Sequence, residues 1–264
     1  MGRFDFAGTL LYSLAIAIIA SSMLRIKDYG SSLALLLGLV ILGVFVVHQR
    51  RKLHPLIDFG LLLESRAFGF ACLILVFLQG AIYAVPFVVT LYLQYIQALS
   101  PQTTGFVLML QAVSTAVIAL FSGRLIGRVS SIKVIGTGIG VGLAGFLLII
   151  FANSDYAFFL IPLGLVAIGI CAGLVETPTI NFMMGCVAGH QRGSASAAVN
   201  SARMFGSLIG ISAISVLLSL TIGDAMITPA VYDALGMAVR DYFLIASIMI
   251  LLCGASLFLA RRSA

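Results

Sequence analysis

The chain has 264 residues, of which 61% are hydrophobic and only 9% are charged, and its mean hydropathy is +1.18. This composition excludes an ordinary soluble domain and indicates an integral membrane protein. The net charge of +6 would by itself suggest an anionic partner such as nucleic acid, but the placement of the basic residues argues against that partner.

Apolar segments long enough to cross about 30 Å of hydrocarbon, which takes roughly 20 helical residues, recur along the whole chain. They occupy residues 6–24, 31–47, 67–96, 104–126, 134–152, 157–184, 194–222 and 242–260. The sequence therefore predicts an all-α membrane protein with about eight transmembrane helices.

The basic residues gather on one side of the membrane if both termini are cytoplasmic. Only Arg25, Lys27 and Arg240 then fall outside. The cations in or beside inside loops are Arg3, Arg50, Arg51, Lys52, Arg66, Arg124, Arg128, Lys133, Arg192, Arg261 and Arg262. This asymmetry follows the positive-inside rule and predicts a cell membrane protein, plasma or bacterial inner, with cytoplasmic termini.

The first two helices are joined by a short turn and are expected to form an antiparallel pair over residues 1–48. The following segment, 49–66, is basic at first and then mixes apolar and acidic residues. That mixture predicts an amphipathic linker on the inner membrane surface, close to anionic headgroups. Residues 67–264 then form a six-helix portion.

The third helix carries Gln79, Tyr83 and Pro86 at positions i, i+4 and i+7. Pro86 removes a backbone donor and should kink the helix. Gln79 and Tyr83 either face a substrate passage or form hydrogen bonds to neighbouring helices. Ser100 and Pro101 form a helix start, with Ser100 as the cap and Pro101 in the first position.

The fourth helix adds the candidate Gln111 to an apolar background, and the fifth is rich in glycine. Gly136 and Gly140, and likewise Gly138 and Gly142, have small-xxx-small spacing. We therefore expect close approach by neighbouring helices on more than one side. A nucleotide loop is rejected because no strand precedes these glycines.

In the sixth helix, Gly169, Gly173 and Glu176 share one face at i, i+4 and i+7, so a neighbouring helix can pack closely beside a carboxylate. Hydrocarbon favours the neutral form of a carboxylate, and Glu176 could exchange a proton or attract a cationic substrate. Two structural alternatives remain: Glu176 pairs with a group on the seventh helix such as Arg203, or it lies wet at the inner rim.

The seventh helix bears a polar stripe that should face protein or water rather than lipid. Its members are Ser196, Asn200, Arg203, Ser207 and Gly210. Arg203 is expected to extend toward the cytoplasmic interface. An outside loop over 223–239 should follow before the last helix.

The remaining residue types predict no metal, no cofactor and no enzyme. Cys72, Cys171 and Cys253 lie in apolar runs without CxxC spacing and are expected to be small core residues. His48 and His54 show no ligand spacing. The apolar run 6–24 is long for a signal peptide, and its charge flank is thin. The catalytic motifs HExxH and the nucleophile elbow are absent from the sequence.

The chain resembles the C-terminal half of a major facilitator superfamily transporter, the fourteen-helix EmrB/QacA type of drug:proton antiporter. The similar segments are 3–8, 54–58, 92–94, 100–105 and 192–196, followed by Asn200, Arg203, Gly206 and Gly210. Gly123, Leu125 and Arg128 match the family's basic inside-loop motif, but Gly127 stands where that motif has Asp and Ser130 where it has Gly. The resemblance implies two linker helices plus one six-helix bundle. The predicted helix-packing positions are Gly169, Gly173, Gly206 and Gly210.

Two functions follow from these observations. The first is part of a proton-coupled multidrug efflux transporter for lipophilic or cationic compounds, partnered by a separately encoded N-terminal half or by a second copy of the chain. The candidate coupling or substrate residues are Glu176, Gln79, Tyr83, Gln111, Asn200 and Arg203. The alternative is a truncated or repurposed membrane fragment that transports nothing on its own.

Overall fold

The computed structural model describes residues 6–23, 29–50, 52, 65–125, 129–152, 157–223 and 228–263. These residues form helices and turns, as the sequence predicts. The α-helices are α1 (Phe6–Met23), α2 (Tyr29–Arg50), α4 (Arg66–Ile82), the short α5 (Val85–Leu91), α6 (Pro101–Leu125), α7 (Ser131–Ile150), α8 (Ala157–Gly185), α9 (Arg192–Thr221) and α10 (Tyr232–Ser263). Short turns of helix occupy Tyr92–Ile96, Gly189–Gln191 and Pro229–Val231.

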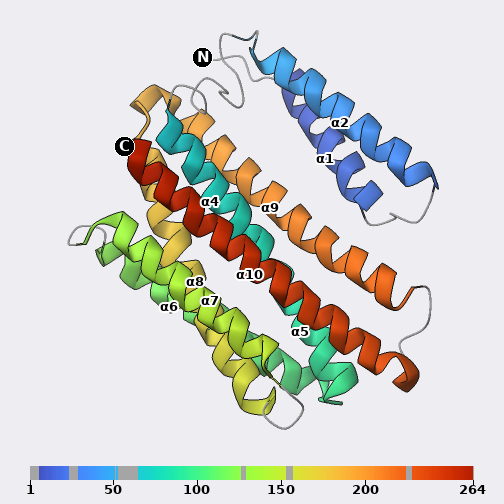
Figure 1. Cartoon of the computed structure of the whole chain (residues 1–264). Helices are drawn as coiled ribbons and strands as arrows, with labels where there is room; N and C mark the ends of the chain where they lie inside the picture. Colours follow the sequence, from blue (N-terminus) through green and yellow to red (C-terminus); the bar gives the residue numbers. More distant parts are fainter. Residues whose placement is uncertain are drawn as a thin grey trace.

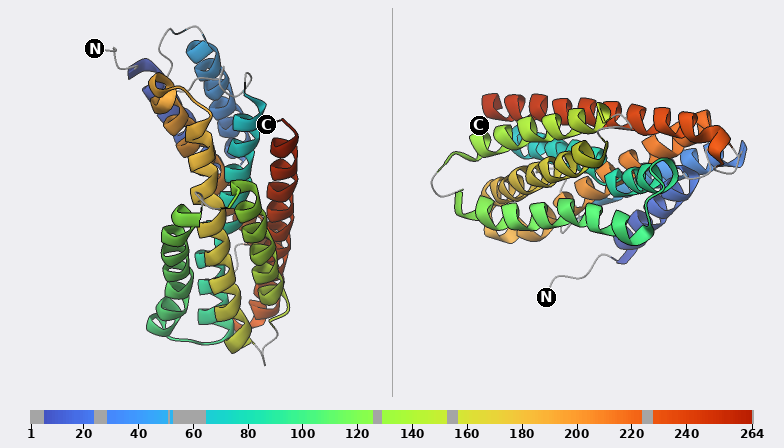
Figure 2. Two further views of the ribbon diagram at one scale, coloured as in Figure 1. Left: turned by 90° about the vertical axis from the view of Figure 1, so that its left-hand side faces the viewer. Right: turned by 90° about the horizontal axis from the view of Figure 1, so that it is seen from below.

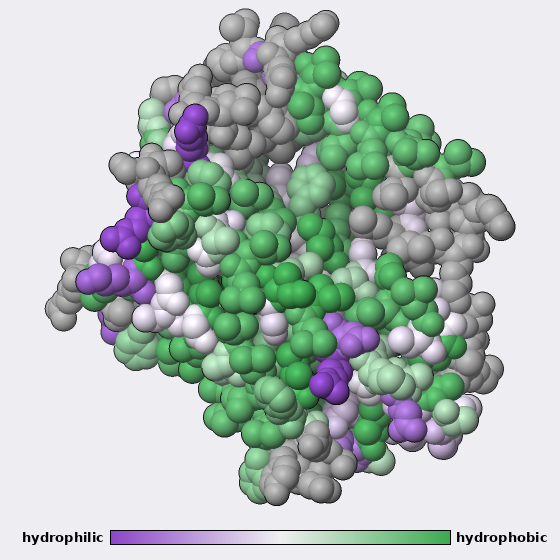
Figure 3. All heavy atoms as spheres, viewed as in Figure 1, coloured by the Kyte–Doolittle hydropathy of each residue, from purple (hydrophilic) through white to green (hydrophobic). Residues whose placement is uncertain are grey.

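Six helical stretches in the described part of the chain are long and apolar enough to cross a membrane. The first of them is Arg66–Ile96, which combines α4, α5 and the short π-helical segment Tyr92–Ile96. The helices α1 and α2 have shorter apolar stretches, Ala7–Ile19 and Leu36–Gln49. Figure 3 shows a broad hydrophobic band, with hydrophilic residues gathered toward the ends of the helices.

The helices run side by side along one long axis (Figures 1 and 2). Within the bundle, α8 packs mainly on α6 and α7, while α4 packs mainly on α9 and α10. These two groups are joined chiefly where α7 lies against α10 and α4 lies against α8. As expected, α1 and α2 form an antiparallel pair, and the pair lies beside α9 (Figure 1).

The main core lies between α4, α5, α7, α8 and α10. Its largest side chains include Phe146 of α7 and Tyr242 and Phe243 of α10, all of them fully buried. The rings of Phe146 and Phe243 are 6.1 Å apart, which is within the range of favourable aromatic contacts.

At the expected kink at Pro86, a two-residue interruption separates α4 from α5, although Tyr83 and Ala84 keep right-handed helical backbone angles. The helix α4 ends at Ile82, and α5 begins at Val85 with Pro86 in its first turn. Tyr242 donates its hydroxyl to the carbonyl oxygen of Ala81 over 3.1 Å. A side chain of α10 thereby supplies a hydrogen bond to the backbone at the break.

The expected start of α6 is confirmed. The backbone N–H of Thr103 donates to Ser100 Oγ over 3.2 Å, and Pro101 is the first helical residue. The preceding Ala98 has a φ of 51°, a left-handed conformation that is uncommon for a residue with a side chain. The sequence indicated neither this residue nor the π-helical turn before it.

Only one of the two glycine pairs in α7 contacts a neighbouring helix closely. A Cβ atom at Gly138 would lie 2.8 Å from Leu174 Cβ, and one at Gly142 would lie 2.9 Å from Cys171 Cβ. A Cβ at Gly136 would meet its nearest atom at 3.9 Å, and one at Gly140 would meet none within 4 Å. The expectation of close packing on more than one side is therefore wrong for the pair Gly136 and Gly140.

The predicted outside loop 223–239 is also wrong in part, because α10 already begins at Tyr232. Four side chains at helical spacing are buried here: Leu235, Ala238, Val239 and Tyr242. The charged residues Arg240 and Asp241 therefore belong to the exposed face of an amphipathic helix end. The predicted linker 49–66 lies for the most part outside the described residues.

Candidate functional site

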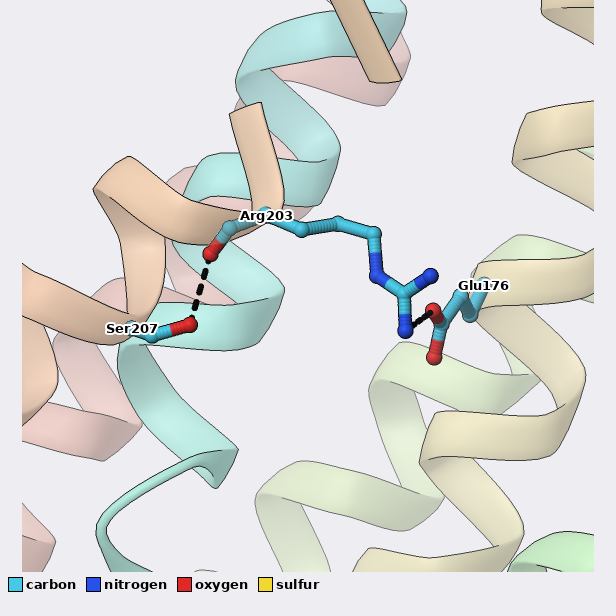
Figure 4. A network of polar contacts seen from close by, with 3 residues as sticks. All are labelled: Glu176, Arg203 and Ser207. Atoms are coloured by element: carbon cyan, nitrogen blue, oxygen red, sulfur yellow. Dashed lines mark hydrogen bonds and ion pairs between the residues drawn. The ribbon is translucent and has the colours of Figure 1, made fainter. Parts of the chain in front are cut away.

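Glu176 of α8 and Arg203 of α9 form an ion pair across the gap between their helices. Arg203 Nη2 lies 2.8 Å from Glu176 Oε1, and Figure 4 shows the arginine side chain extended toward the carboxylate. One turn further along α9, Ser207 donates its hydroxyl to the backbone oxygen of Arg203 over 2.7 Å. Of the structural alternatives left open by the sequence, pairing is therefore the one observed.

The ion pair lies well inside both helices, but nearer to the end of α8 and the start of α9 than to their other ends. Glu176 precedes Gly185, the last residue of α8, by nine positions, and Arg203 follows Arg192, the first residue of α9, by eleven. At a rise of 1.5 Å per residue these positions are about 14 Å and about 17 Å from the helix ends. The expectation that Arg203 extends toward the interface is wrong, because its guanidinium group is directed to Glu176 instead.

The pair is neither fully buried nor fully exposed. The side chain of Glu176 is 22% exposed and that of Arg203 is 42% exposed. The two charges link the group α6, α7 and α8 to the group α4, α9 and α10, whose direct contact through α8 and α9 is slight. An ion pair at this depth compensates two charges that would each be costly alone in a low-dielectric surrounding.

Glycines hold the helices that carry the pair, as the sequence predicts. A Cβ at Gly169 would lie 2.8 Å from Ser114 Cβ, and one at Gly173 would lie 2.9 Å from the backbone nitrogen of Ala119. Close packing of α6 against the glycine face of α8 is therefore confirmed. Glu176 follows these glycines on α8, and its side chain extends toward Arg203 of α9.

A second glycine contact joins α9 to α4 directly after Arg203. A Cβ at Gly206 would lie 2.8 Å from Gln79 Cβ and would overlap the carbonyl oxygen of Val76, while one at Gly210 would overlap that of Gly80. The backbones of the two helices therefore touch at this crossing. The contact limits how far α9 can shift or turn, and it thereby positions Arg203.

The structure separates the other candidate side chains. Gln79 lies at the α4–α9 crossing beside Gly206. Gly206 follows Arg203 by three residues on α9. Tyr83, at the break after α4, is 55% exposed, and Asn200 is exposed one turn before Arg203. Of the predicted stripe on α9, Gly210 is buried against α4, whereas Ser196 and Asn200 are exposed.

Gln111 does not join this group. It is 8% exposed and belongs to α6, where its backbone lies against Gly169, two helical turns from Glu176. Within the described residues its Oε1 atom has no hydrogen-bond partner. Its position favours the interpretation of a packing residue between α6 and α8.

The inside-loop motif is described only in part. Gly123 is exposed near the end of α6, and a Cβ there would meet no atom within 4 Å. Leu125 is the last residue of α6, and Arg128 lies outside the described residues. As expected, Cys72, Cys171 and Cys253 are buried. In the described part of the chain no cluster of three or more histidine, cysteine or acidic side chains could hold a metal ion.

Two contacts of tyrosine residues were missed by sequence reasoning. One is the bond from Tyr242 to the break in α4, and the other joins α1 to α9, where Tyr12 donates its hydroxyl to Ser201 Oγ over 3.1 Å. Tyrosine within an apolar helix is a weak signal for such contacts, since its hydroxyl usually finds a partner when buried. The spacing along each helix does not reveal which partner that is.

The family model that describes the Major Facilitator Superfamily matches residues 6–211 and 73–264, and the chain belongs to this superfamily of membrane transporters. That membership agrees with the prediction that the chain is not an enzyme. Similar curated proteins are named multidrug resistance protein Stp and drug efflux pump JefA, both of Mycobacterium tuberculosis, and puromycin resistance protein pur8 of Streptomyces alboniger.

The chain is 27% identical to Stp over 82% of its own length and 41% of that protein. It is 26% identical to JefA over 85% of its own length and 45% of the length of JefA. It is 28% identical to pur8 over 80% of its own length and 43% of the length of pur8. The chain thus spans less than half the length of these relatives.

Proposed function

We propose that this member of the Major Facilitator Superfamily is part of a proton-coupled efflux transporter of the EmrB/QacA type, which exports lipophilic or cationic drugs. The names of the similar proteins support efflux of drugs. In this proposal residues 1–48 are two linker helices, 49–66 a cytoplasmic linker and 67–264 one six-helix bundle, with both termini cytoplasmic. A second bundle, from an N-terminal half or a second copy, completes the transport path.

The observation that carries this proposal is the ion pair between Glu176 and Arg203, well inside α8 and α9. The carboxylate can be neutralised by Arg203, by a proton or by a cationic substrate, and these partners compete for it. A proton on Glu176 expels the cation and also releases Arg203. Because proton and substrate exclude one another at a single carboxylate, their binding is coupled with opposite sign, as antiport requires.

The other polar candidates have supporting roles in this scheme at separate places along the helices. Gln79, Tyr83 and Asn200 offer hydrogen bonds and an aromatic ring to a passing substrate, which suits binding of varied lipophilic compounds. The glycine crossing of α9 with α4 keeps Arg203 within reach of Glu176. When the pair opens, the two groups of helices lose a charged link and can shift relative to one another.

The proposal predicts opposite effects of the two single substitutions on binding of a lipophilic cation. Tetraphenylphosphonium binding to the purified chain should weaken about tenfold in Glu176→Gln, which corresponds to about 1.4 kcal/mol. It should tighten by a similar factor in Arg203→Gln, because the competing cation is removed. Arg240→Gln, which removes an exposed cation of α10, is the matched control and should change little.

Binding of the cation should also weaken as the pH falls in the unmodified chain, and this dependence should disappear in Glu176→Gln. If both single variants bind tetraphenylphosphonium within twofold of the unmodified chain, the competition at Glu176 is refuted. Transport itself is tested by proton-driven efflux of a cationic dye in everted vesicles, with the chain alone and with a co-expressed N-terminal bundle. Loss of efflux in Glu176→Gln is the expected result.

A further inference from the structure

A cavity of about 230 Å³ separates the helix pair α1 and α2 from α4 and α9. Its walls come from all four helices and include Tyr12, Leu42, Phe45, Cys72, Val76 and Phe205. The volume is several times the roughly 30 Å³ that one water molecule occupies in the liquid. The helix pair therefore contacts the bundle without closing against it completely.

The cavity is apolar, and its two hydroxyl groups already have hydrogen-bond partners. Tyr12 donates to Ser201 over 3.1 Å, and Ser201 donates to the backbone oxygen of Ala197 over 2.8 Å. The ring of Tyr12 lies 5.3 Å from that of Phe45. The lining offers a water molecule few hydrogen-bond partners, so an apolar ligand gains contacts here that water cannot replace.

Along the helical stretches Arg66–Ile96 and Arg192–Thr221, the cavity lies in the half that is nearest to the basic end of the molecule. Cys72 and Val76 follow Arg66, the first residue of α4, by six and ten positions, which corresponds to about 9 Å and about 15 Å. Ala198 and Ala202, which also line the cavity, follow Arg192 on α9 by the same numbers of positions. The cavity thus lies at the depth of the acyl chains of a single leaflet, since the hydrocarbon core is about 30 Å thick.

Exposed cations surround the end of the molecule at which this half lies. Arg66 begins α4, Arg192 begins α9 and Lys52 follows α2, and all three side chains are exposed. The helices α4 and α9 run in the same direction, so that their starts lie at the same end of the bundle (Figure 1). Basic residues at the end of a transmembrane bundle attract anionic headgroups.

We propose that the cavity holds an acyl chain of an anionic phospholipid whose phosphate lies among Lys52, Arg66 and Arg192. The apolar walls select the hydrocarbon chain, and the three cations select the anionic headgroup. The lipid fills the space that the protein leaves open and joins the α1–α2 pair to the bundle. This proposal depends on a membrane location and not on the transport mechanism.

The test uses the absence of tryptophan from the sequence. Phe45→Trp introduces a single fluorophore at the cavity wall, and Phe121→Trp introduces one at an exposed position of α6 outside it. The two positions have similar depth, since they precede the ends of α2 and α6 by five and four residues. Each variant is reconstituted with phosphatidylglycerol or phosphatidylcholine that carries bromine on its acyl chains, and quenching is measured.

In Phe45→Trp, brominated phosphatidylglycerol should quench at least twice as effectively as brominated phosphatidylcholine at equal mole fraction. In Phe121→Trp the two lipids should quench equally. The added substitutions Arg66→Gln and Arg192→Gln should remove the preference in Phe45→Trp, whereas Arg240→Gln, near the opposite end of the bundle, should leave it unchanged.

The proposal is overturned by equal quenching by both lipids in Phe45→Trp, by no quenching there at all, or by a preference that persists without the two arginines. If Phe45→Trp does not retain its helical circular dichroism, Val46→Trp replaces it, because Val46 lines the same cavity. The same outcomes then decide the question.

Discussion

The glycines of α7 allow a matched pair of substitutions that tests the packing of the bundle. Alanine at Gly142 would place a methyl group 2.5 Å from Cys171 Sγ and 2.9 Å from its Cβ, whereas alanine at Gly140 would meet no atom within 4 Å. Both changes replace glycine by alanine on the same helix, so the effect on helix propensity is the same. Any difference in stability then reports the contact with α8.

The expected magnitudes follow from these distances. Replacing glycine by alanine within a helix gains about 0.5–1 kcal/mol, and Gly140→Ala should show this gain. Overpacking a tight contact costs about 1–3 kcal/mol, so Gly142→Ala should lose up to about 2 kcal/mol in total. Because the propensity gain is common to both variants, their free energies of unfolding should differ by about 1–3 kcal/mol.

Reversible unfolding in mixed micelles, followed by circular dichroism, measures this difference. Cys171→Ala removes the sulfur atom that the new methyl group would strike, and in the Gly142→Ala background it should recover part of the lost stability. Equal stability of Gly140→Ala and Gly142→Ala within about 0.5 kcal/mol, the usual error of additivity, would refute the contact between α7 and α8 described here.

Three further outcomes are expected. Tyr242→Phe removes the bond to the Ala81 carbonyl at the break in α4 and should cost about 1–3 kcal/mol in the same unfolding assay; unchanged stability would mean that this carbonyl needs no such donor. Ser100→Ala removes the cap of α6 and should cost about 1 kcal/mol, against no change in Ser21→Ala, whose exposed hydroxyl bonds within its own helix. Cys186 is the exposed one among the four cysteines, so an impermeant maleimide should label it in everted vesicles and not in intact cells; the reverse pattern would overturn the predicted orientation. Partial burial raises the pKa of this thiol, so its thiolate fraction and labelling rate should be low at neutral pH and rise as the pH increases toward that pKa.

The helices could be predicted because the signal for each is local. The expected segment 104–126 corresponds to α6 at Pro101–Leu125, and the cap at Ser100 together with Pro101 marks its start. The break at Pro86 follows equally from one residue, since proline lacks the backbone donor that the helix requires. Such features depend on neighbouring residues of the same segment and not on the rest of the fold.

The partners of each helix face could not be predicted in the same way. Gly136 and Gly140 have the same spacing as Gly138 and Gly142, but only the latter pair faces α8 closely. The start of α10 was missed because Arg240 and Asp241 suggest a loop when burial is unknown. Both of these side chains are exposed, while Val239 and Tyr242 beside them are buried, so a tertiary contact decides the structure there.

The candidate site shows the same limit. The sequence singled out Glu176 and Arg203 because a charge within an apolar helix is costly, but their separation of 27 residues leaves several arrangements open. Their contact depends on the glycine faces that seat α8 against α6 and α9 against α4. Stability alone does not require such a pair, since well-packed apolar residues in place of a buried pair are often as stable. In the proposed function the pair exchanges partners rather than holding the bundle together, and competition by protons and cations at Glu176 is the property that separates these two roles.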